Sequence, residues 1–149
     1  MRIFIGGVMQ ASNHGKKLMD QDYRRQIGEA LTARWPDVEV VDPYALHPNS
    51  VDYDDAAAKA TLFAMIDLAI GSDLVIAYAP VASMGTAMEM YAAYQHGVPV
   101  VAISPMAENW VVRSLSQRVY NNLGSFLAAI QAADTPAALL NRWDADERG

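Results

Sequence analysis

Residues 72–103 read SDLVIAYAPVASMGTAMEMYAAYQHGVPVVAI, and this stretch decides the fold. The apolar run at residues 73–78 has the length and composition of a strand from the centre of a sheet. Residues 84–96 are expected to form a helix, because Gly97 follows them and glycine commonly ends helices. A second apolar strand is expected at residues 98–103. A strand, a helix and a strand in this order form a crossover between parallel strands.

The rest of the chain repeats this alternation. Further strands are expected at residues 2–5, 38–41 and 119–120, and further helices at residues 22–35, 56–70, 109–116, 123–133 and 136–143. The prolines of residues 42–55 indicate turns. Strands that alternate with helices predict a mostly parallel, five-stranded sheet with helices on both faces. We therefore expect one α/β domain over residues 1–149, a doubly wound, flavodoxin-like sandwich.

Composition limits the class of protein. The 149 residues include 52% apolar and 19% charged side chains, as in ordinary folded domains. The formal net charge of -6 disfavours nonspecific binding to DNA or to an anionic membrane surface. No apolar run approaches the roughly 20 residues of a membrane-spanning helix, and the first residues do not resemble a signal peptide. We expect a cytoplasmic protein without nucleic-acid or membrane partners.

Metal and cysteine chemistry find no support in the sequence. The chain has no cysteine, which excludes disulfides, thiolate zinc sites and a cysteine nucleophile. His14, His47 and His96 do not have the spacing of zinc ligands. No nucleophile elbow supports a Ser-His-Asp triad. The sequence therefore predicts neither a metal nor a cofactor.

One glutamate interrupts the apolar, small-residue helix at residues 84–96. The residues three and four positions from Glu89 are small and uncharged, so it has no partner for a salt bridge within the helix. Glu89 is either a solvated helix residue or a buried acid with a chemical role. The dipole at the start of a helix favours an ionised carboxylate. In that form Glu89 is a competent nucleophile or electrostatic stabiliser.

Ligands of open parallel sheets bind outside the carboxyl ends of the strands. Three loops are expected at these positions: residues 6–17, 79–85 and 104–109. The first begins with Gly6 and Gly7, which allow a ligand close to the backbone. It is also longer than most connections between a strand and a helix. Lys16 and Lys17 in this loop either attract a phosphate or are simply solvated.

Ser83 and Asp67 also allow both a structural and a functional interpretation. Ser83 can cap the following helix, or it can act with Gly85 to present backbone N–H groups to an anion. Asp67 lies in an apolar helix six positions before Asp73. An acid in such surroundings either faces solvent or is paired or functional.

The motif Ser83-x-Gly85-x-x-x-Glu89 resembles the nucleoside 2-deoxyribosyltransferase superfamily. This superfamily includes base-exchanging transferases and nucleotide N-glycoside hydrolases, namely 2′-deoxynucleoside 5′-phosphate N-hydrolases and pyrimidine nucleotide hydrolases. The resemblance covers residues 3–116, and it implies a role in nucleotide metabolism without a cofactor.

The resemblance assigns roles to particular residues. It implies that Glu89 is the catalytic carboxylate, which attacks or stabilises C1′ of the sugar, and that Asp67 matches a helix aspartate that assists it. Gly7 would line the sugar and base pocket. A neighbouring subunit completes the site in the superfamily, which implies a homodimer or higher homo-oligomer. Asn109 or Ser114 would be the residue contributed here.

The resemblance also bears on the substrate. An aspartate stands at the position of Ser83 in the transferases and contacts the 5′-hydroxyl group, whereas a serine contacts the 5′-phosphate in the hydrolases. An aspartate repels phosphate and a serine accepts it, so Ser83 favours a nucleoside 5′-monophosphate. The arginine that contacts phosphate in some hydrolases is absent, and Gln10 or Lys16 would replace it. Ile3 and Phe4 stand where the superfamily often has a tyrosine.

Two other functions remain alternatives. A base-exchanging transferase would transfer the sugar to an acceptor base faster than to water. A non-catalytic nucleotide-binding module would bind its ligand without forming a product. Ser83 favours the hydrolase over the first, and Glu89 with Asp67 favours an enzyme over the second.

Overall fold

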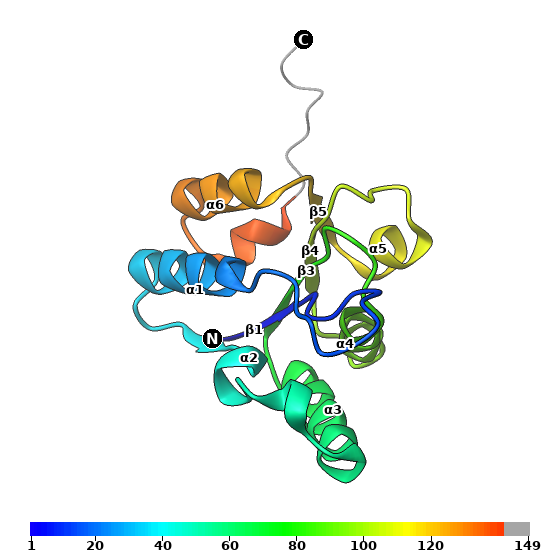
Figure 1. Ribbon diagram of the computed structural model, residues 1–149. Coiled ribbons are helices and arrows are strands. Elements are labelled where there is room, and N and C mark those ends of the chain that lie inside the picture. Colours follow the sequence, from blue (N-terminus) through cyan, green and yellow to red (C-terminus); the bar gives the residue numbers. More distant parts are fainter. Residues whose placement is uncertain (142–149) are drawn as a thin grey trace.

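A computed structural model describes residues 1–141 of the chain (Figure 1). Its five strands form one sheet in the order β2-β1-β3-β4-β5, and every neighbouring pair is parallel. The strands are β1 (Arg2–Gly7), β2 (Glu39–Val41), β3 (Leu74–Tyr78), β4 (Val100–Ile103) and β5 (Arg118–Tyr120). The expected flavodoxin-like α/β fold is confirmed, with a sheet that is entirely parallel.

Helices cover both faces of this sheet (Figure 1). One face packs against α1 (Asp22–Arg34) and α6 (Leu123–Ala132). The other face packs against α3 (Asp55–Ile70), α4 (Met84–Gln95) and α5 (Trp110–Leu115). The crossover from β3 through α4 to β4 has the bounds expected from its sequence to within two residues.

The structure adds detail to one expected connection and corrects another element. Within the turn-rich segment at residues 42–55 lie the short helix α2 (Pro43–Leu46) and the 3-10 helix η1 (Ser50–Asp52). The side chain of Asp42 caps α2 by accepting the N–H of Tyr44 at 3.0 Å. The helix expected at residues 136–143 is a 3-10 helix, η2 (Pro136–Leu140), and its last expected residues lie outside the described residues.

The alternation of side chains along β1 determines which face of the sheet each of its last residues meets. Ile3 and Ile5 pack on the face covered by α1 and α6, whereas Phe4 packs on the face covered by α4. Successive residues of a strand point to opposite faces. Gly6 therefore faces α4, and Gly7 faces α1.

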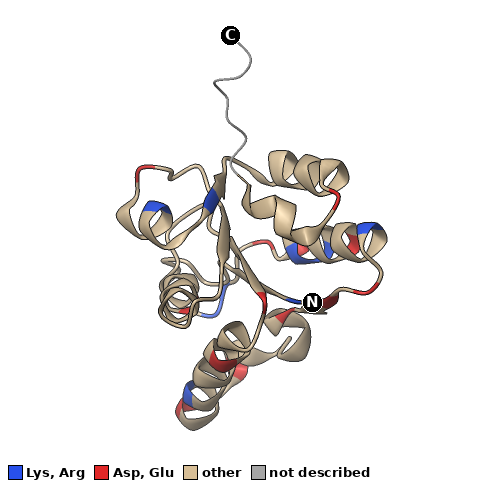
Figure 2. Ribbon diagram, turned by 180° about the vertical axis from the view of Figure 1, so that it is seen from behind, with Lys and Arg blue, Asp and Glu red and all other residues tan. Residues whose placement is uncertain are grey.

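Charge is distributed unevenly over the helices (Figure 2). The sequence of α1 contains five charged residues, whereas that of α4 contains one, Glu89. The helix α4 begins at its cap Ser83 and ends before Gly97, whose φ of 72° is the left-handed conformation that favours glycine. Within residues 1–141, no helix combines the length and the apolar character needed to span a membrane.

Candidate active site

The carboxyl ends of β1 and β3 lie side by side at the point where the strand order reverses. From β1 the chain crosses to β2 through α1, and from β3 it crosses to β4 through α4 on the other face. Ligands of flavodoxin-like sheets bind at this point. A cleft of about 280 Å³ opens there, between the loop after β1, the segment before α3 and the start of α4.

Glu89 extends from the second turn of α4 to the end of β1. A side chain on Gly6 would place its Cβ only 2.6 Å from Oε2 of Glu89. The carboxyl group therefore occupies the space that a side chain on Gly6 would fill. Within residues 1–141, the carboxyl group of Glu89 forms no ion pair. It lines the cleft and is partly exposed there, so it can meet a ligand.

Burial dominates the electrostatics of this carboxyl group. Burial away from solvent raises the pKa of Glu89 to about 8, and the positive charge of Arg24 opposes this rise. Burial therefore favours the protonated form of Glu89, and Arg24 favours the ionised form. The dipole at the start of α4 also favours the ionised form, but burial is the largest influence on the pKa of this carboxyl group.

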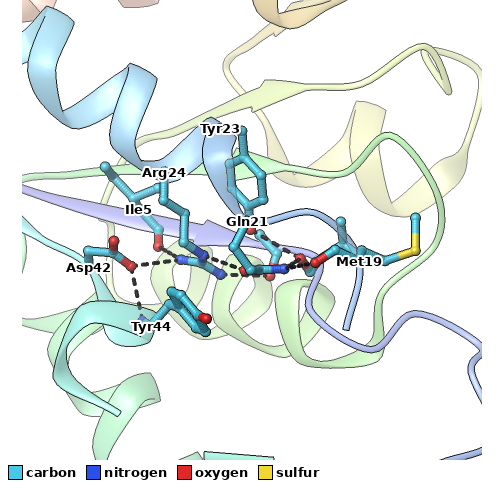
Figure 3. A network of polar contacts seen from close by, with 9 residues as sticks. Ile5, Met19, Gln21, Tyr23, Arg24, Asp42 and Tyr44 are labelled. Atoms are coloured by element: carbon cyan, nitrogen blue, oxygen red, sulfur yellow. Dashed lines mark hydrogen bonds and ion pairs between the residues drawn. The ribbon is translucent and has the colours of Figure 1, made fainter. Parts of the chain in front are cut away.

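Arg24 is a buried cation that lines the cleft. Figure 3 shows the network of polar contacts around its guanidinium group. Its Nη1 donates to the carbonyl oxygen of Ile5 at 2.9 Å and to Oδ1 of Asp42 at 3.1 Å. Its Nη2 donates to the carbonyl oxygen of Gly7 at 3.1 Å, and its Nε donates to Oε1 of Gln21 at 2.8 Å. The guanidinium group thus connects α1 to the ends of β1 and β2.

The expected site residues do not include Arg24, although its place in the sequence indicates a buried arginine. Arg24 lies three positions before Ile27 and seven before Leu31, on the buried face of α1. Its side chain is only 3% exposed. An arginine on the core face of a helix needs several acceptors, and the end of a strand supplies them.

Tyr23 explains why β1 ends in a second glycine. Its hydroxyl group donates to the carbonyl oxygen of Val8 at 3.1 Å, and its ring centroid lies 4.1 Å from that of Tyr78. A Cβ on Gly7 would overlap the Tyr23 ring, since Cε2 of the ring lies 2.8 Å from that position. Gly7 therefore allows Tyr23 to pack beneath the floor of the cleft.

Ser83 lies at the start of α4, in the wall of the cleft. Its Oγ accepts the hydroxyl group of Thr86 at 2.9 Å and the N–H of Thr86 at 3.4 Å. Because Oγ accepts in both contacts, its own hydrogen can be donated to a ligand. The N–H groups of Met84 and Gly85 belong to the first turn and have no partner within the helix. A Cβ on Gly85 would meet nothing within 4 Å, so this turn is open to a ligand.

A second, largely apolar pocket of about 400 Å³ adjoins the cleft. Ser83 and Thr86 line both. Asn109 lines the second pocket and caps α5, where its Oδ1 accepts the N–H of Val111 at 3.0 Å. Ser114 is exposed on α5 and lines neither the cleft nor this pocket. The structure thus brings Asn109, but not Ser114, next to Ser83.

Some of the other predicted binding residues line the cleft and one does not. Gly7, Gln10 and Gly85 line the cleft. Lys16 does not line it, and its exposed ammonium group is paired with Oδ1 of Asp52 at 2.8 Å. Of the two suggested replacements for a phosphate-binding arginine, only Gln10 is in position.

The structure does not bring Asp67 to Glu89. Asp67 is exposed on α3 and does not line the cleft. Thr61 and Met65 face the cleft from this helix. Two positions separate Met65 from Asp67, which places them on nearly opposite sides of a helix with 3.6 residues per turn. Glu89 is the one acidic side chain that lines the cleft in the described part of the chain.

Two further features of the cleft were not expected. Tyr53 lines it, and the Tyr53 hydroxyl group lies 2.8 Å from Nδ1 of His47. Ala11 lines both the cleft and the second pocket with a φ of 50°, a conformation unusual for a residue with a side chain. Strained backbone of this kind gathers at functional sites. Within residues 1–141, no group of three or more histidine or acidic side chains is arranged to hold a metal ion.

Comparison with known proteins finds relatives in structure only. The sequence matches no protein-family model and no curated protein sequence. A 2-deoxyribosyltransferase from the psychrotolerant bacterium Bacillus psychrosaccharolyticus has a similar structure, with a TM-score of 0.65 and 14% identity over 93% of this chain and 96% of that chain. A conserved protein from Enterococcus faecalis V583 has a TM-score of 0.61 and 20% identity over 89% of this chain and 98% of that chain. At these identities the likeness establishes the fold.

Proposed function

We propose that the protein hydrolyses the N-glycosidic bond of a nucleoside 5′-monophosphate and releases the free base and ribose or 2′-deoxyribose 5-phosphate. The observation that carries the proposal is the position of Glu89. A single carboxyl group faces the ligand cleft of the fold and rests on a glycine, without an ion pair to another described residue. Such a group is free to meet a developing positive charge at C1′.

The proposed reaction follows the chemistry of retaining glycosidases. A carboxylate oxygen of Glu89 bonds to C1′ while the bond from C1′ to the base nitrogen breaks. The electron pair leaves with the base, which takes a proton from water. Water then attacks C1′ and gives a proton to the hydroxide left by the first step, the bond between C1′ and Glu89 breaks, and the carboxylate is restored. Only ionised Glu89 acts in this way, so kcat should rise with pH toward the pKa of about 8.

The phosphate would be held by neutral donors. Arg24 is the one cation that lines the cleft in the described residues, and its guanidinium group is bonded to protein oxygens. The Ser83 hydroxyl group and the N–H groups of Met84 and Gly85 lie at the start of α4. The helix dipole favours an anion at this end of the helix.

We also propose that the protein forms a homo-oligomer with sites near the subunit contact. Large apolar side chains are exposed along α4 and α5 beside the second pocket. Met84, Met88 and Tyr91 lie on one face of α4, because they are four and three positions apart. Asn109 lies at the edge of this surface, where it could contribute to a site of the partner subunit.

Base exchange is the second candidate. The fold neighbour described as a 2-deoxyribosyltransferase favours it. The two reactions share the bond between Glu89 and C1′ and differ in whether water or a second base attacks it. A nucleotide-binding module without turnover is the remaining candidate, and it would need no free carboxyl group at Glu89.

The test is a chromatographic assay of nucleoside 5′-monophosphates and the matching nucleosides, with and without an acceptor base. We expect base to be released from the monophosphates alone, and Glu89→Gln to lower kcat by at least about 10³-fold. Asp67→Asn is the matched control, since it makes the same change on the exposed side of α3 and should retain turnover.

Each other outcome contradicts part of the proposal. Base exchange on unphosphorylated nucleosides would make the protein a transferase and would reject the role of Ser83. Full activity in Glu89→Gln would reject the catalytic role of Glu89. Binding of nucleotides without any product would indicate a binding module.

A further inference from the structure

Arg24 and Glu89 meet the same short piece of backbone from opposite faces of the sheet. Arg24 binds the carbonyl oxygens of Ile5 and Gly7, the residues on either side of Gly6. The carboxyl group of Glu89 rests on Gly6 itself. The backbone on which Glu89 rests is therefore fixed by the guanidinium group.

We propose that Arg24 is a positioning residue for Glu89, which holds the end of β1 in place and supplies the positive charge that favours the ionised carboxylate. The inference rests on the proposed function in one respect: it takes ionised Glu89 as the reactive group. Its structural part, the coupling of Arg24 to Glu89 through Gly6, does not depend on the substrate.

Arginine suits this role better than other cations. The planar guanidinium group reaches four acceptors on three segments at once, namely Ile5, Gly7, Gln21 and Asp42. A lysine ammonium group is a single point and cannot span them. Because Arg24 is only 3% exposed, solvent screens its charge weakly.

Other charged or titratable groups around Glu89 do not replace Arg24. The groups that face the region from the surrounding elements are Tyr23 of α1, Asp42 after β2, Tyr53 before α3 and Tyr78 of β3. The part of α3 that lines the cleft carries no charge: Ala58, Thr61, Leu62 and Met65. Arg24 is the one positive charge of this set, and Asp42, bonded to it, reduces its effect.

Direct titration of Glu89 tests the inference without an assay of activity. The carboxyl ¹³C signal of Glu89, assigned by its loss in Glu89→Gln, is followed against pH by NMR. Burial raises the pKa of Glu89 to about 8, which is the midpoint expected for the wild type. Arg24→Gln removes the opposing charge and should raise the midpoint by about one pH unit. An unchanged midpoint in a folded Arg24→Gln protein would overturn the inference.

Arg25→Gln is the matched control. Arg25 is the next residue of α1, but it is exposed and pairs with Asp22 at 2.9 Å and Glu29 at 2.8 Å. This variant makes the same loss of charge away from the cleft. The midpoint of Glu89 should not move, and an equal shift in both variants would reject a specific role for Arg24.

Asp42→Asn covers the case in which Arg24→Gln does not fold. Asparagine keeps the size of the side chain and an oxygen that can cap α2. Loss of the negative charge leaves Arg24 less neutralised, so the midpoint of Glu89 should fall. A rise or no change would contradict the inference. Arg24→Lys, which keeps the charge alone, should keep the midpoint near that of the wild type but lower kcat.

The two proposals fail in distinguishable ways. If the midpoints shift as expected and no nucleotide is hydrolysed, the coupling of Arg24 to Glu89 holds and the proposed function is rejected. If nucleotides are hydrolysed and the midpoints do not shift, the function holds and the role of Arg24 is rejected.

Discussion

The carboxyl group of Glu89 fits against the backbone at the end of β1. Gly6 leaves room for Oε2, and Gly7 leaves room for Tyr23 on the other face of β1. Because β1 ends in two glycines, the side chain of Glu89 can approach it from one face of the sheet and that of Tyr23 from the other. At the scale of single residues, the observed positions of Glu89 and Tyr23 therefore require glycine at positions 6 and 7.

Gly6→Ala should displace the carboxyl group without unfolding the protein. The new Cβ would lie 2.6 Å from Oε2, but the clashing atom ends a flexible side chain that can rotate away. We expect a loss of stability of about 1 kcal/mol or less and a fall in kcat of about 10²-fold, because the reacting atom moves. Urea unfolding and the base-release assay measure these effects.

Gly28→Ala is the control for Gly6→Ala. Gly28 lies within α1, and the nearest atom to a Cβ there is 3.9 Å away. The substitution should stabilise α1 by up to about 1 kcal/mol and leave kcat unchanged. Equal activity of the two variants would show that Glu89 does not depend on the space over Gly6.

At the scale of secondary structure, α4 provides most of the proposed site. Its cap Ser83 offers a hydroxyl group, its first turn offers free N–H groups, and its second turn carries Glu89. A cap and a phosphate contact are compatible here, because the Ser83 oxygen accepts from Thr86 while its hydrogen remains available. The observed cap is therefore compatible with the proposed phosphate contact of Ser83.

Ser83→Asp separates these two roles. Aspartate caps helices as well as serine does, so α4 should keep its start, but a carboxylate repels a phosphate. We expect the ratio of kcat/KM for a nucleoside 5′-monophosphate to that for the nucleoside to fall by at least about 10-fold, or 1.4 kcal/mol. Ser83→Ala, which loses the cap, should cost about 1 kcal/mol of stability. An unchanged ratio in Ser83→Asp would place the phosphate elsewhere.

At the scale of the whole molecule, one side carries a row of large exposed apolar residues. Met84 and Trp110 are each 83% exposed, and Tyr91 and Tyr94 are more than half exposed. Large apolar side chains that gather on the surface mark contacts between proteins. The helices that carry it also border the second pocket. A homo-oligomer would cover this surface and enclose the pocket at the same time.

Trp110→Glu should weaken this assembly. A charge at the centre of a subunit contact costs free energy of association, so the protein should sediment at a smaller mass at equal concentration. Gln131→Glu is the matched control, because it adds a charge to an exposed position of α6 on the opposite face of the sheet. A wild-type protein that sediments as a monomer would reject the oligomer.

The sequence by itself determined the elements and their class. Apolar runs, helical spacing and a glycine after the helix are local signals, and they placed β3, α4 and β4 within two residues of their observed bounds. They also placed Ser83, Gly85 and Glu89 at the start of a helix that follows a central strand. The connections were less predictable, because α2 has only four residues and begins at the single cap Asp42, and η1 has only three residues and no side-chain cap.

Only the tertiary structure decided which side chains meet. The helix α3 is apolar on nearly all sides, so its sequence did not reveal that Met65, and not Asp67, faces the cleft. The contact of Glu89 with Gly6 and the bonds of Arg24 to Ile5 and Gly7 join residues far apart in the chain. Local periodicity fixes the face on which a residue lies within its own element. The order of the strands and the packing of helices on them fix what that face meets, and with it the burial that raises the pKa of Glu89.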